Sequence, residues 1–329
     1  MGSLLSFLGT AHTLRSQVSI DSWRKDHIGG LMSFAESLNT ILVATDLKGN
    51  SEAALEYARK LAVAYSARIV IAHGLDPLEF ADVEAVPARI RRRMPEQARA
   101  AVDQMAADLI REGIHSHSEV RQGEVVEMLL EVAQQYHAGL IVVGTKGHQG
   151  AGPVAVGAIA EELVRRASCV VLAVAADWNA GEFRPTPGGP VMLAIEQNEA
   201  APAAAEAACS LASVFKRTLI IVHARTAAES SAFLNPCSTS AAQFGIRETG
   251  EFPVRCVVKD GNPADAVNRA VLQYRPSILV TGGKRKSGSG GPHGTVFALL
   301  AASRAPVLCV PAGPSATAQP ELQVAVQSS

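Results

Sequence analysis

The sequence predicts two tandem α/β domains, each an open, doubly wound parallel sheet of five strands. Three observations lead to this prediction. The chain has 329 residues, which exceeds the usual size of one domain. Short apolar runs alternate with segments of helical period, as parallel strands joined by crossover helices require. The same order of elements then occurs a second time.

The first half alternates buried strands with helices. Each expected strand is rich in Val, Ile, Leu or Ala, and each expected helix has apolar residues at helical spacing. The expected strands are Thr40–Asp46, Arg68–Gly74, His115–Arg121, Leu140–Gly144 and Cys169–Ala175. The expected helices are Ser51–Tyr65 (capped by Asn50 or Ser51), Met94–Gly113, Glu124–Tyr136 and Gly157–Arg166. Together they define a first domain over residues 38–176.

A linker over residues 177–189 separates this domain from a second one over residues 190–313. The segment Asp177–Pro190 contains three prolines and three glycines, which disfavour both helix and strand. The strands expected after it are Val191–Glu196, Thr218–Ala224, Val254–Val258, Ile278–Gly282 and Pro306–Val310. The helices expected there are Ala201–Phe215, Ala264–Tyr274 and Thr295–Ala302, whereas Arg225–Phe252 reads mostly as loop. Asn262 and Pro263 suit the cap and first position of the helix that they precede.

The two ends of the chain lie outside the repeats. Residues 1–37 form an N-terminal arm, in which a short helix is expected around Met32–Glu36. Residues 314–329 are polar, and a disordered tail is expected there.

Composition and charge narrow the range of functions. Hydrophobic residues make up 48% and charged residues 19%, which is typical of globular proteins. The formal net charge of -1 gives no reason to expect nucleic acid or a membrane as a partner. No apolar run approaches the ~20 residues that span a bilayer. The five cysteines lack zinc-ligand spacing, so we expect a reduced, cytoplasmic protein without structural metal.

Three landmarks of the first domain fall at the carboxyl ends of expected strands, where open parallel sheets bind ligands. Asp46 ends the first strand, Gly74 the second and Gly144 the fourth. Gly144, Gly147 and Gly157 then form the pattern GxxG(x9)G before the last helix. Glycine lets main-chain N–H groups approach phosphate oxygens, and a helix N-terminus adds partial positive charge. The loop therefore suits a nucleotide phosphate.

This glycine pattern, in this place, resembles the ATP-binding signature of the universal stress protein family. The VATD segment that ends at Asp46 and the closing strand near Cys169 agree with the resemblance. It covers nearly all of residues 39–176 and most of residues 190–312. A glycine pattern alone is weak evidence, but its position between a strand and a helix makes it specific.

The resemblance implies ATP, with Mg²⁺, as the ligand of the first domain. The residues that would border the adenosine are Ala44, Asp46, Gly74, Val143 and Gly144. The residues whose main chain would meet the phosphates are Gly147, Gly157, Ala158 and Ile159.

Two departures from the family pattern predict weak binding. Ala158 stands where ATP-binding members carry Ser or Thr, and Gly74 replaces a branched apolar residue. The second domain departs further, because Glu196 replaces the aspartate and Arg285 replaces the second glycine. Its Gly294-Thr295 pair is retained. The first domain is therefore the expected nucleotide site.

Plainer interpretations accompany these functional ones. Asp46 can cap the turn that follows it, and His73 and His223 read as packed structural residues. The basic segments Lys284–Lys286 and Arg89–Arg93 suit a solvated loop or a contact surface.

The leading hypothesis is a stress-response protein that binds ATP and regulates an unknown protein partner. The alternatives are a slow ATPase that uses Asp46 or Glu196, and a nucleotide-free interaction module. No nucleophile with a positioned base is visible, so no catalytic residue is proposed. The two domains are expected to pair with each other as family dimers do. The strands Cys169–Ala175 and Pro306–Val310 are candidate edges for that pairing or for a homodimer.

Overall fold

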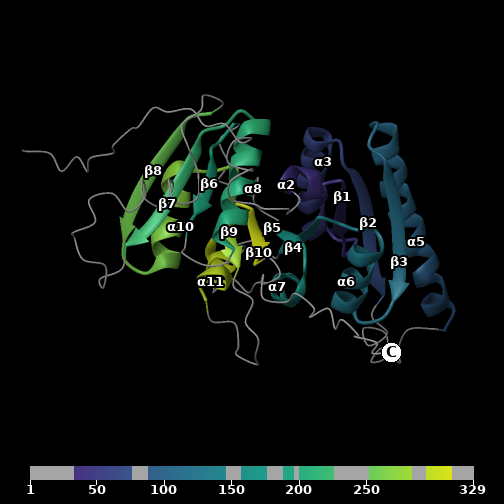
Figure 1. Cartoon of the computed structure of the whole chain (residues 1–329). Coiled ribbons are helices and arrows are strands. Elements are labelled where there is room, and N and C mark those ends of the chain that lie inside the picture. The colour runs from purple at the N-terminus through teal and green to yellow at the C-terminus, as the bar shows by residue number, and fades with distance from the viewer. Residues whose placement is uncertain are drawn as a thin grey trace, which may run out of the picture.

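One sheet of ten strands runs through the molecule, and helices cover both of its faces (Figure 1). This computed structural model describes residues 33–75, 88–145, 157–175, 188–195, 200–225, 252–283 and 294–312. The strand order is β3-β2-β1-β4-β5-β10-β9-β6-β7-β8, so the first half supplies the first five strands and the second half the other five. The two predicted five-stranded sheets are therefore joined edge to edge.

The elements of the first half follow the predicted order. Its strands are β1 (Thr40–Ala44), β2 (Arg68–Leu75), β3 (Ser116–Gln122), β4 (Leu140–Thr145) and β5 (Val170–Ala175). Its helices are α2 (Phe34–Ser37), α3 (Glu52–Tyr65), α5 (Ala88–Arg111), α6 (Val125–Gln135) and α7 (Ala158–Arg166), with the 3-10 turn η1 (Gly49–Ser51) before α3.

The second half repeats this order. Its strands are β6 (Val191–Ala194), β7 (Leu219–Arg225), β8 (Val254–Asp260), β9 (Ile278–Gly283) and β10 (Val307–Pro311). Its helices are α8 (Ala201–Val214), α10 (Pro263–Tyr274) and α11 (Thr295–Ala302). The Asn262 Oδ1 atom accepts a hydrogen bond from the Ala264 N–H at 3.0 Å, so Asn262 caps α10 as predicted. Most of the segment expected as loop, and most of the linker and the tail, lie outside the described residues.

Several expected boundaries were wrong, and one expected side-chain cap is not made. Strand β1 ends at Ala44 and not at Asp46, because the chain turns at residues 45–48, where Leu47 is left-handed. Ser51 precedes α3, but its side chain does not cap the helix. Its hydroxyl group instead donates to the Lys48 carbonyl at 2.9 Å. Helix α5 begins at Ala88, so Arg89–Arg93 belong to the helix and not to the connector before it.

The strands bury side chains on both faces, which explains their continuous apolar runs. In β1, Ile41 faces one hydrophobic core and Leu42 faces the other. The first core lies under α2, α3, α5 and α8. The second lies under α6, α7, α10 and α11. Each core contains residues of both halves, so the molecule is a three-layer α/β/α sandwich with no core boundary between them.

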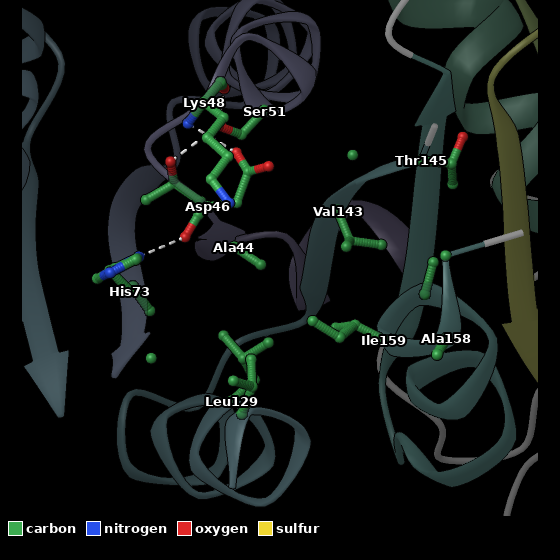
Figure 2. Close-up of a pocket in the computed structure, with 17 residues that line it drawn as sticks. Ala44, Asp46, Lys48, Ser51, His73, Leu129, Val143, Thr145, Ala158 and Ile159 are labelled. Carbon is green, nitrogen blue, oxygen red and sulfur yellow. Dashed lines mark hydrogen bonds between the residues drawn. The ribbon is translucent and has the colours of Figure 1, made fainter. Parts of the chain in front are cut away.

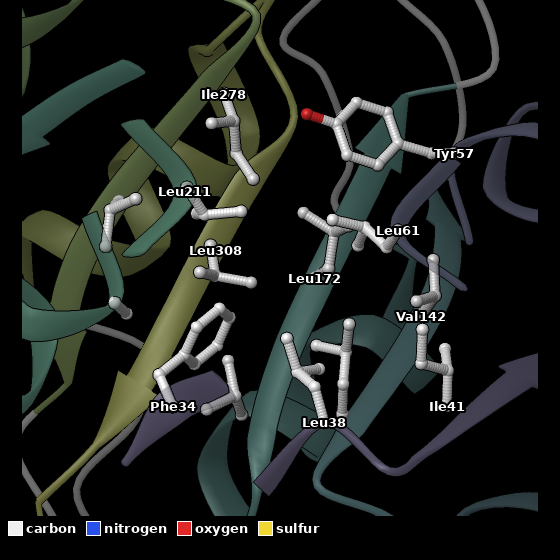
Figure 3. Close-up of a cluster of buried hydrophobic side chains, with 14 of the residues drawn as sticks. Phe34, Leu38, Ile41, Tyr57, Leu61, Val142, Leu172, Leu211, Ile278 and Leu308 are labelled. Carbon is white, nitrogen blue, oxygen red and sulfur yellow. The ribbon is translucent and has the colours of Figure 1, made fainter. Parts of the chain in front are cut away.

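The halves meet where β5 pairs with β10 in antiparallel orientation, the only antiparallel pair among the described strands. Leu172 lies opposite Leu308, and both side chains point into the core that Figure 3 shows. Above this pair, the Tyr57 hydroxyl group of α3 donates to the Ser277 carbonyl of the second half at 3.0 Å. The strand order reads the same from either end, as a pseudo-twofold axis at this pair requires.

The short helix α2 adds a buried polar contact between the halves. The Phe34 N–H donates to the Glu206 carboxylate of α8 at 2.8 Å, and Glu206 is 5% exposed. The Phe34 ring packs edge-on against Tyr65, whose hydroxyl group lies 3.1 Å from the Ser210 Oγ atom. Burial raises the pKa of Tyr65, and the negative charge of Glu206 raises it further. This phenol is therefore protonated at neutral pH. A segment that precedes the first strand therefore fixes the helices of both halves.

A close backbone contact fixes the start of β4. A Cβ atom added to Gly139 would lie 1.8 Å from the Ser37 carbonyl oxygen, which is main chain and cannot rotate away. The Gly139 N–H also donates to the Thr40 carbonyl at 3.1 Å, so the residue cannot move without disturbing β1. Only glycine fits here.

We expect Gly139→Ala to lower the free energy of unfolding by about 1–3 kcal/mol, the usual cost of overpacking. Chemical denaturation of the purified chain measures this change. Gly49→Ala is the matched control, because an added Cβ there meets no atom within 4 Å. Equal stabilities of the two variants would contradict the close contact.

Candidate functional site

A cleft of about 320 Å³ opens at the carboxyl ends of β1, β2 and β4, between α6 and the N-terminus of α7. This is where an open parallel sheet is expected to bind ligands. Strand β1 lies between β2 and β4 in the sheet, so the three strand ends are adjacent. The connections after β1 and β4 lead to opposite faces of the sheet, and they separate to form the cleft.

All the sequence-predicted site residues but Gly147 line this cleft. Gly147 lies outside the described residues, as do the other residues of the segment 146–156. The predicted residues that line the cleft are Ala44, Asp46, Gly74, Val143, Gly144, Gly157, Ala158 and Ile159. They come from four elements that are far apart in the sequence, and the structure brings them together.

Several lining residues were missed by the sequence reasoning. They are Thr45, Lys48, Ser51, Ala72, His73, Val125, Leu129, Thr145 and Ala160. For Thr45 and Lys48 a signal existed, because both lie within two residues of Asp46. Leu129 had none, since an apolar residue on an amphipathic helix reads as core.

Asp46 both lines the cleft and shapes the turn after β1. Its Oδ1 atom accepts the Lys48 N–H at 2.9 Å, which is the turn-capping role of an aspartate. Its side chain is exposed and borders the cleft (Figure 2). The turn-capping interpretation of Asp46 is therefore confirmed, whereas its role in binding a ligand stays a prediction.

His73 supports the same turn. Its Nδ1 atom lies 2.8 Å from the Thr45 carbonyl oxygen. A carbonyl oxygen only accepts, so Nδ1 carries the hydrogen in this contact. This agrees with the prediction that His73 is a structural residue.

The opposite side of the cleft is the N-terminus of α7. Gly157 occupies the cap position and offers no side chain, and its carbonyl accepts the Glu161 N–H at 3.1 Å. The first N–H groups of a helix have no partner within the helix, and they carry partial positive charge. Ala158 and Ile159 are exposed at this end. The geometry suits an anion.

An apolar surface connects the two ends of the cleft. Figure 2 shows Val143 and Ile159 between Asp46 on one side and Ala158 on the other, with Leu129 of α6 below them. Val143 is buried, whereas Ile159 is 38% exposed and points into the opening. A flat apolar part of a ligand could pack against this surface. Charged groups of the ligand at either end of the cleft would not reach the surface.

Two of the four described cysteines have thiols that burial makes less acidic. Burial raises the pKa of Cys169 to about 11 and that of Cys309 to about 12, so both thiols stay protonated near neutral pH. Across the described ranges, no three His, Cys, Asp or Glu side chains gather where they could hold a metal ion. None of the helices described here is long and apolar enough to cross a membrane.

Among the described residues of the second half, one element matches the site of the first. Gly294 precedes α11 as Gly157 precedes α7, and an added Cβ meets no atom within 4 Å at either glycine. Thr295 follows it with a hydroxyl group. Glu196 and Arg285, the residues expected to obstruct a nucleotide, lie outside the described residues, as does the rest of the basic segment Lys284–Lys286.

Comparison with known sequences identifies the first half. Residues 38–175 match the Universal stress protein family. Universal stress protein A homolog 1 of Coxiella burnetii is 28% identical over 138 residues, which are 41% of this chain and 94% of that protein. A universal stress protein of Mycolicibacterium smegmatis is 28% identical over 189 residues, which are 56% of this chain and 63% of that protein.

Comparison with solved structures extends the likeness to both halves. The crystal structure of a universal stress protein from Archaeoglobus fulgidus aligns with a TM-score of 0.69 at 18% identity, covering 84% of this chain and 99% of that one. A putative universal stress protein from Pseudomonas aeruginosa aligns with a TM-score of 0.60, also at 18% identity, over 84% of this chain and 94% of its own. At these identities the likeness concerns the fold.

The structure explains why glycine is tolerated at position 74. A Cβ added to Gly74 would lie 2.9 Å from the Met128 Cε atom and 3.1 Å from the Val125 Cγ2 atom. Two residues of α6 thus fill the space that a larger side chain would occupy.

We expect Gly74→Val to lower the free energy of unfolding by about 1–3 kcal/mol, because Met128 and Val125 must move. Met128→Ala removes the nearest atom. The free energy of unfolding is measured by chemical denaturation for both single variants and for the double variant. The loss in the double variant should be smaller than the sum of the two single losses by at least about 0.5 kcal/mol. Additive losses would contradict the steric explanation.

Proposed function

Because residues 38–175 belong to the universal stress protein family, we propose that the chain binds ATP weakly through the cleft of its first half. It then acts as a regulatory or interaction protein in the stress response. The observation that carries the proposal is the convergence of Asp46, Gly144 and the N-terminus of α7 on one cleft. Its volume of about 320 Å³ lies within the range of small-molecule sites.

The charges of the cleft favour one orientation of the ligand. An ionised carboxylate only accepts hydrogen bonds, so Asp46 suits the hydroxyl groups of a ribose, and the cationic Lys48 lines the cleft beside it. The N-terminus of α7 suits phosphate. Asp46 and Ala158 lie on opposite sides of the cleft (Figure 2), so the nucleoside would lie at β1 and the phosphates at α7. The apolar surface between them would contact the base and sugar.

Weak binding follows from the residues that line the phosphate end. Ala158 offers a main-chain N–H but no hydroxyl group to a terminal phosphate. Mg²⁺ would arrive bound to the phosphates, its usual partners in nucleotide sites. A nucleotide-free interaction module is the alternative that Ala158 favours.

A slow ATPase receives less support from the geometry. Of the two carboxylates considered for it, Asp46 lies at the proposed nucleoside end of the cleft (Figure 2), and Glu196 lies outside the described residues. A group that activates water must lie within hydrogen-bond reach of the attacking water at the phosphates.

The contacts between the halves support a regulatory output. Arg165 of α7 lies over the Phe297 ring of α11, with 5.3 Å between the guanidinium carbon and the ring centroid. Strand β4, which borders the cleft, pairs with β5, and β5 pairs with β10 of the second half. A ligand that orders the N-terminus of α7 would therefore act on a helix in direct contact with the second half.

The first test is direct. The purified chain is denatured, and the supernatant is analysed for adenine nucleotide, followed by calorimetric titration of the nucleotide-free chain with Mg-ATP. We expect measurable heat of binding at one site per chain. A chain that carries no nucleotide and gives no heat would overturn the proposal.

Gly157→Val should abolish ATP binding, because its side chain would block approach of the phosphates to the main chain of α7. The fold should tolerate it, since φ is -59° and an added Cβ meets no atom within 4 Å. Gly294→Val makes the equivalent change before α11 and should leave the affinity unchanged. Calorimetry of both variants provides the measurement, and equal losses would contradict the assignment to the first half.

Ala158→Ser should tighten Mg-ATP binding by about tenfold or more. A hydrogen bond to a charged group contributes about 1.5–3 kcal/mol, and about 1.4 kcal/mol corresponds to tenfold in affinity. The exposed position makes desolvation of the hydroxyl group a smaller effect. Thr295→Ala, at the matching position of α11, serves as the control and should not change the affinity. Unchanged or weaker binding by the serine variant would show that position 158 does not face the phosphates.

A further inference from the structure

The turn after β1 contains a strained residue. Leu47 has φ of 56°, in the left-handed region that side chains other than those of Gly, Asn and Asp rarely adopt. This conformation costs roughly 1–2 kcal/mol for an ordinary residue. Leu47 is partly buried against the core, and it directly follows Asp46. Strain of this kind persists only where the surrounding structure holds it.

The hydroxyl groups of Thr45 and Ser51 stabilise this turn, and the donor in each of their hydrogen bonds can be deduced. The Ser51 Oγ atom donates its one hydrogen to the Lys48 carbonyl at 2.9 Å. The Thr45 Oγ1 atom lies 2.9 Å from Ser51 Oγ, so Thr45 must be the donor in that pair. The Thr45 Oγ1 lone pairs then remain for the Leu47 N–H, which donates to them at 3.0 Å. Each hydroxyl group therefore donates once and accepts once.

Both hydroxyl groups are buried, which makes the arrangement costly to break. Thr45 is 7% exposed and Ser51 is 5% exposed. A buried polar group that loses its partner destabilises a structure by about 1–3 kcal/mol. The turn therefore has a second stable arrangement only if both hydroxyl groups find new partners.

Two further bonds join Thr45 to strand β2. The Thr45 N–H donates to the Ala72 carbonyl at 2.9 Å. The Thr45 carbonyl accepts from His73 Nδ1 at 2.8 Å. Main chain and side chain of Thr45 are thus both fixed, and Asp46 lies between this anchor and the strained Leu47.

We propose that Thr45 is a positioning residue that holds Asp46 in place to select ribonucleotides by their ribose hydroxyl groups. The inference rests on the proposed function, because it requires that the nucleoside lies at β1. Thr45 acts through Asp46: its Oγ1 atom fixes the Leu47 N–H, and the left-handed turn at Leu47 sets the direction of the preceding carboxylate. The Asp46 Oδ1 bond to the Lys48 N–H fixes the same side chain from the far side of the turn.

Two substitutions distinguish the effect of the Thr45 hydroxyl group from the effect of its branched shape. Thr45→Val keeps the branched shape but loses the donor and the acceptor, and Thr45→Ser keeps the hydroxyl group. Each variant and the unchanged chain are titrated calorimetrically with Mg-ATP and with Mg-2′,3′-dideoxy-ATP. We expect the unchanged chain and Thr45→Ser to prefer ATP by about tenfold, as the loss of hydrogen bonds to a charged group predicts. Thr45→Val should lose this preference, with its affinity for the dideoxynucleotide unchanged.

Amide hydrogen exchange of the ligand-free chain tests the turn itself. The Leu47 and Lys48 amides should exchange slowly in the unchanged chain and in Thr45→Ser, and at least about tenfold faster in Thr45→Val. Thermal unfolding checks that Thr45→Val remains folded. If it does not, the comparison of Thr45→Ser with Ser51→Ala, which removes the acceptor for the Thr45 hydroxyl group, gives the same test.

The outcomes distinguish the two ideas. An unchanged chain that binds neither nucleotide overturns the proposed function and this inference with it. A chain that binds ATP but shows no preference over the dideoxynucleotide overturns the inference alone. The same holds if Thr45→Val retains the full preference, or loses exchange protection without losing the preference.

Discussion

The antiparallel pairing of β5 with β10 is the contact on which the rest of the molecule depends. Each half on its own would expose this strand as an edge, with unpaired main-chain groups and apolar side chains on both faces. Pairing satisfies those groups, and it places Leu172 opposite Leu308, so the cores of both halves become continuous. The register contains only three residue pairs, so the helices on both faces must add to the junction. Tyr57 and Phe34 make such contacts on one face, and Arg165 lies over Phe297 on the other.

This junction also determines how a ligand in one half can influence the other. Because the axis of pseudo-symmetry passes between β5 and β10, the last helices of the two halves, α7 and α11, become neighbours. The helix whose N-terminus borders the cleft is thus the helix that contacts the second half. Two separate domains that did not share the β5–β10 pair would not bring α7 and α11 together in this way. A ligand in the cleft of the first half would therefore border a helix that contacts the second half.

The two sides of the cleft are built differently: many hydrogen bonds fix the side at β1, whereas no side chain caps the helix at the side of α7. At β1, five hydrogen bonds among Thr45, Ser51 and their neighbours fix the strained turn that presents Asp46. At α7, Gly157 has no side chain that could block or cap the helix, and Ala158 is exposed. The rigid side suits recognition of a sugar, because a preorganised acceptor does not lose conformational entropy on binding. The other side suits phosphate, which main-chain N–H groups contact without a specific side chain.

The sequence alone determined the elements and the family, because both are local properties: apolar runs, helical period, the glycine pattern and the Asn262 cap each depend on residues close together in the chain. It also identified eight of the 17 residues that line the cleft, since strand ends in a parallel sheet meet at one edge. The end of β1 at Ala44 was not predicted from the sequence. The turn that contains the left-handed Leu47 ends the strand earlier than the apolar run indicates. From the sequence, β5 and β10 were candidate edges, but only the tertiary structure decided that they pair with each other within one chain. It also decided the contact of Phe34 with Glu206 and the filling of the space beside Gly74 by Met128. These contacts join residues far apart in the sequence, and their partners are chosen by packing geometry, which no local pattern records.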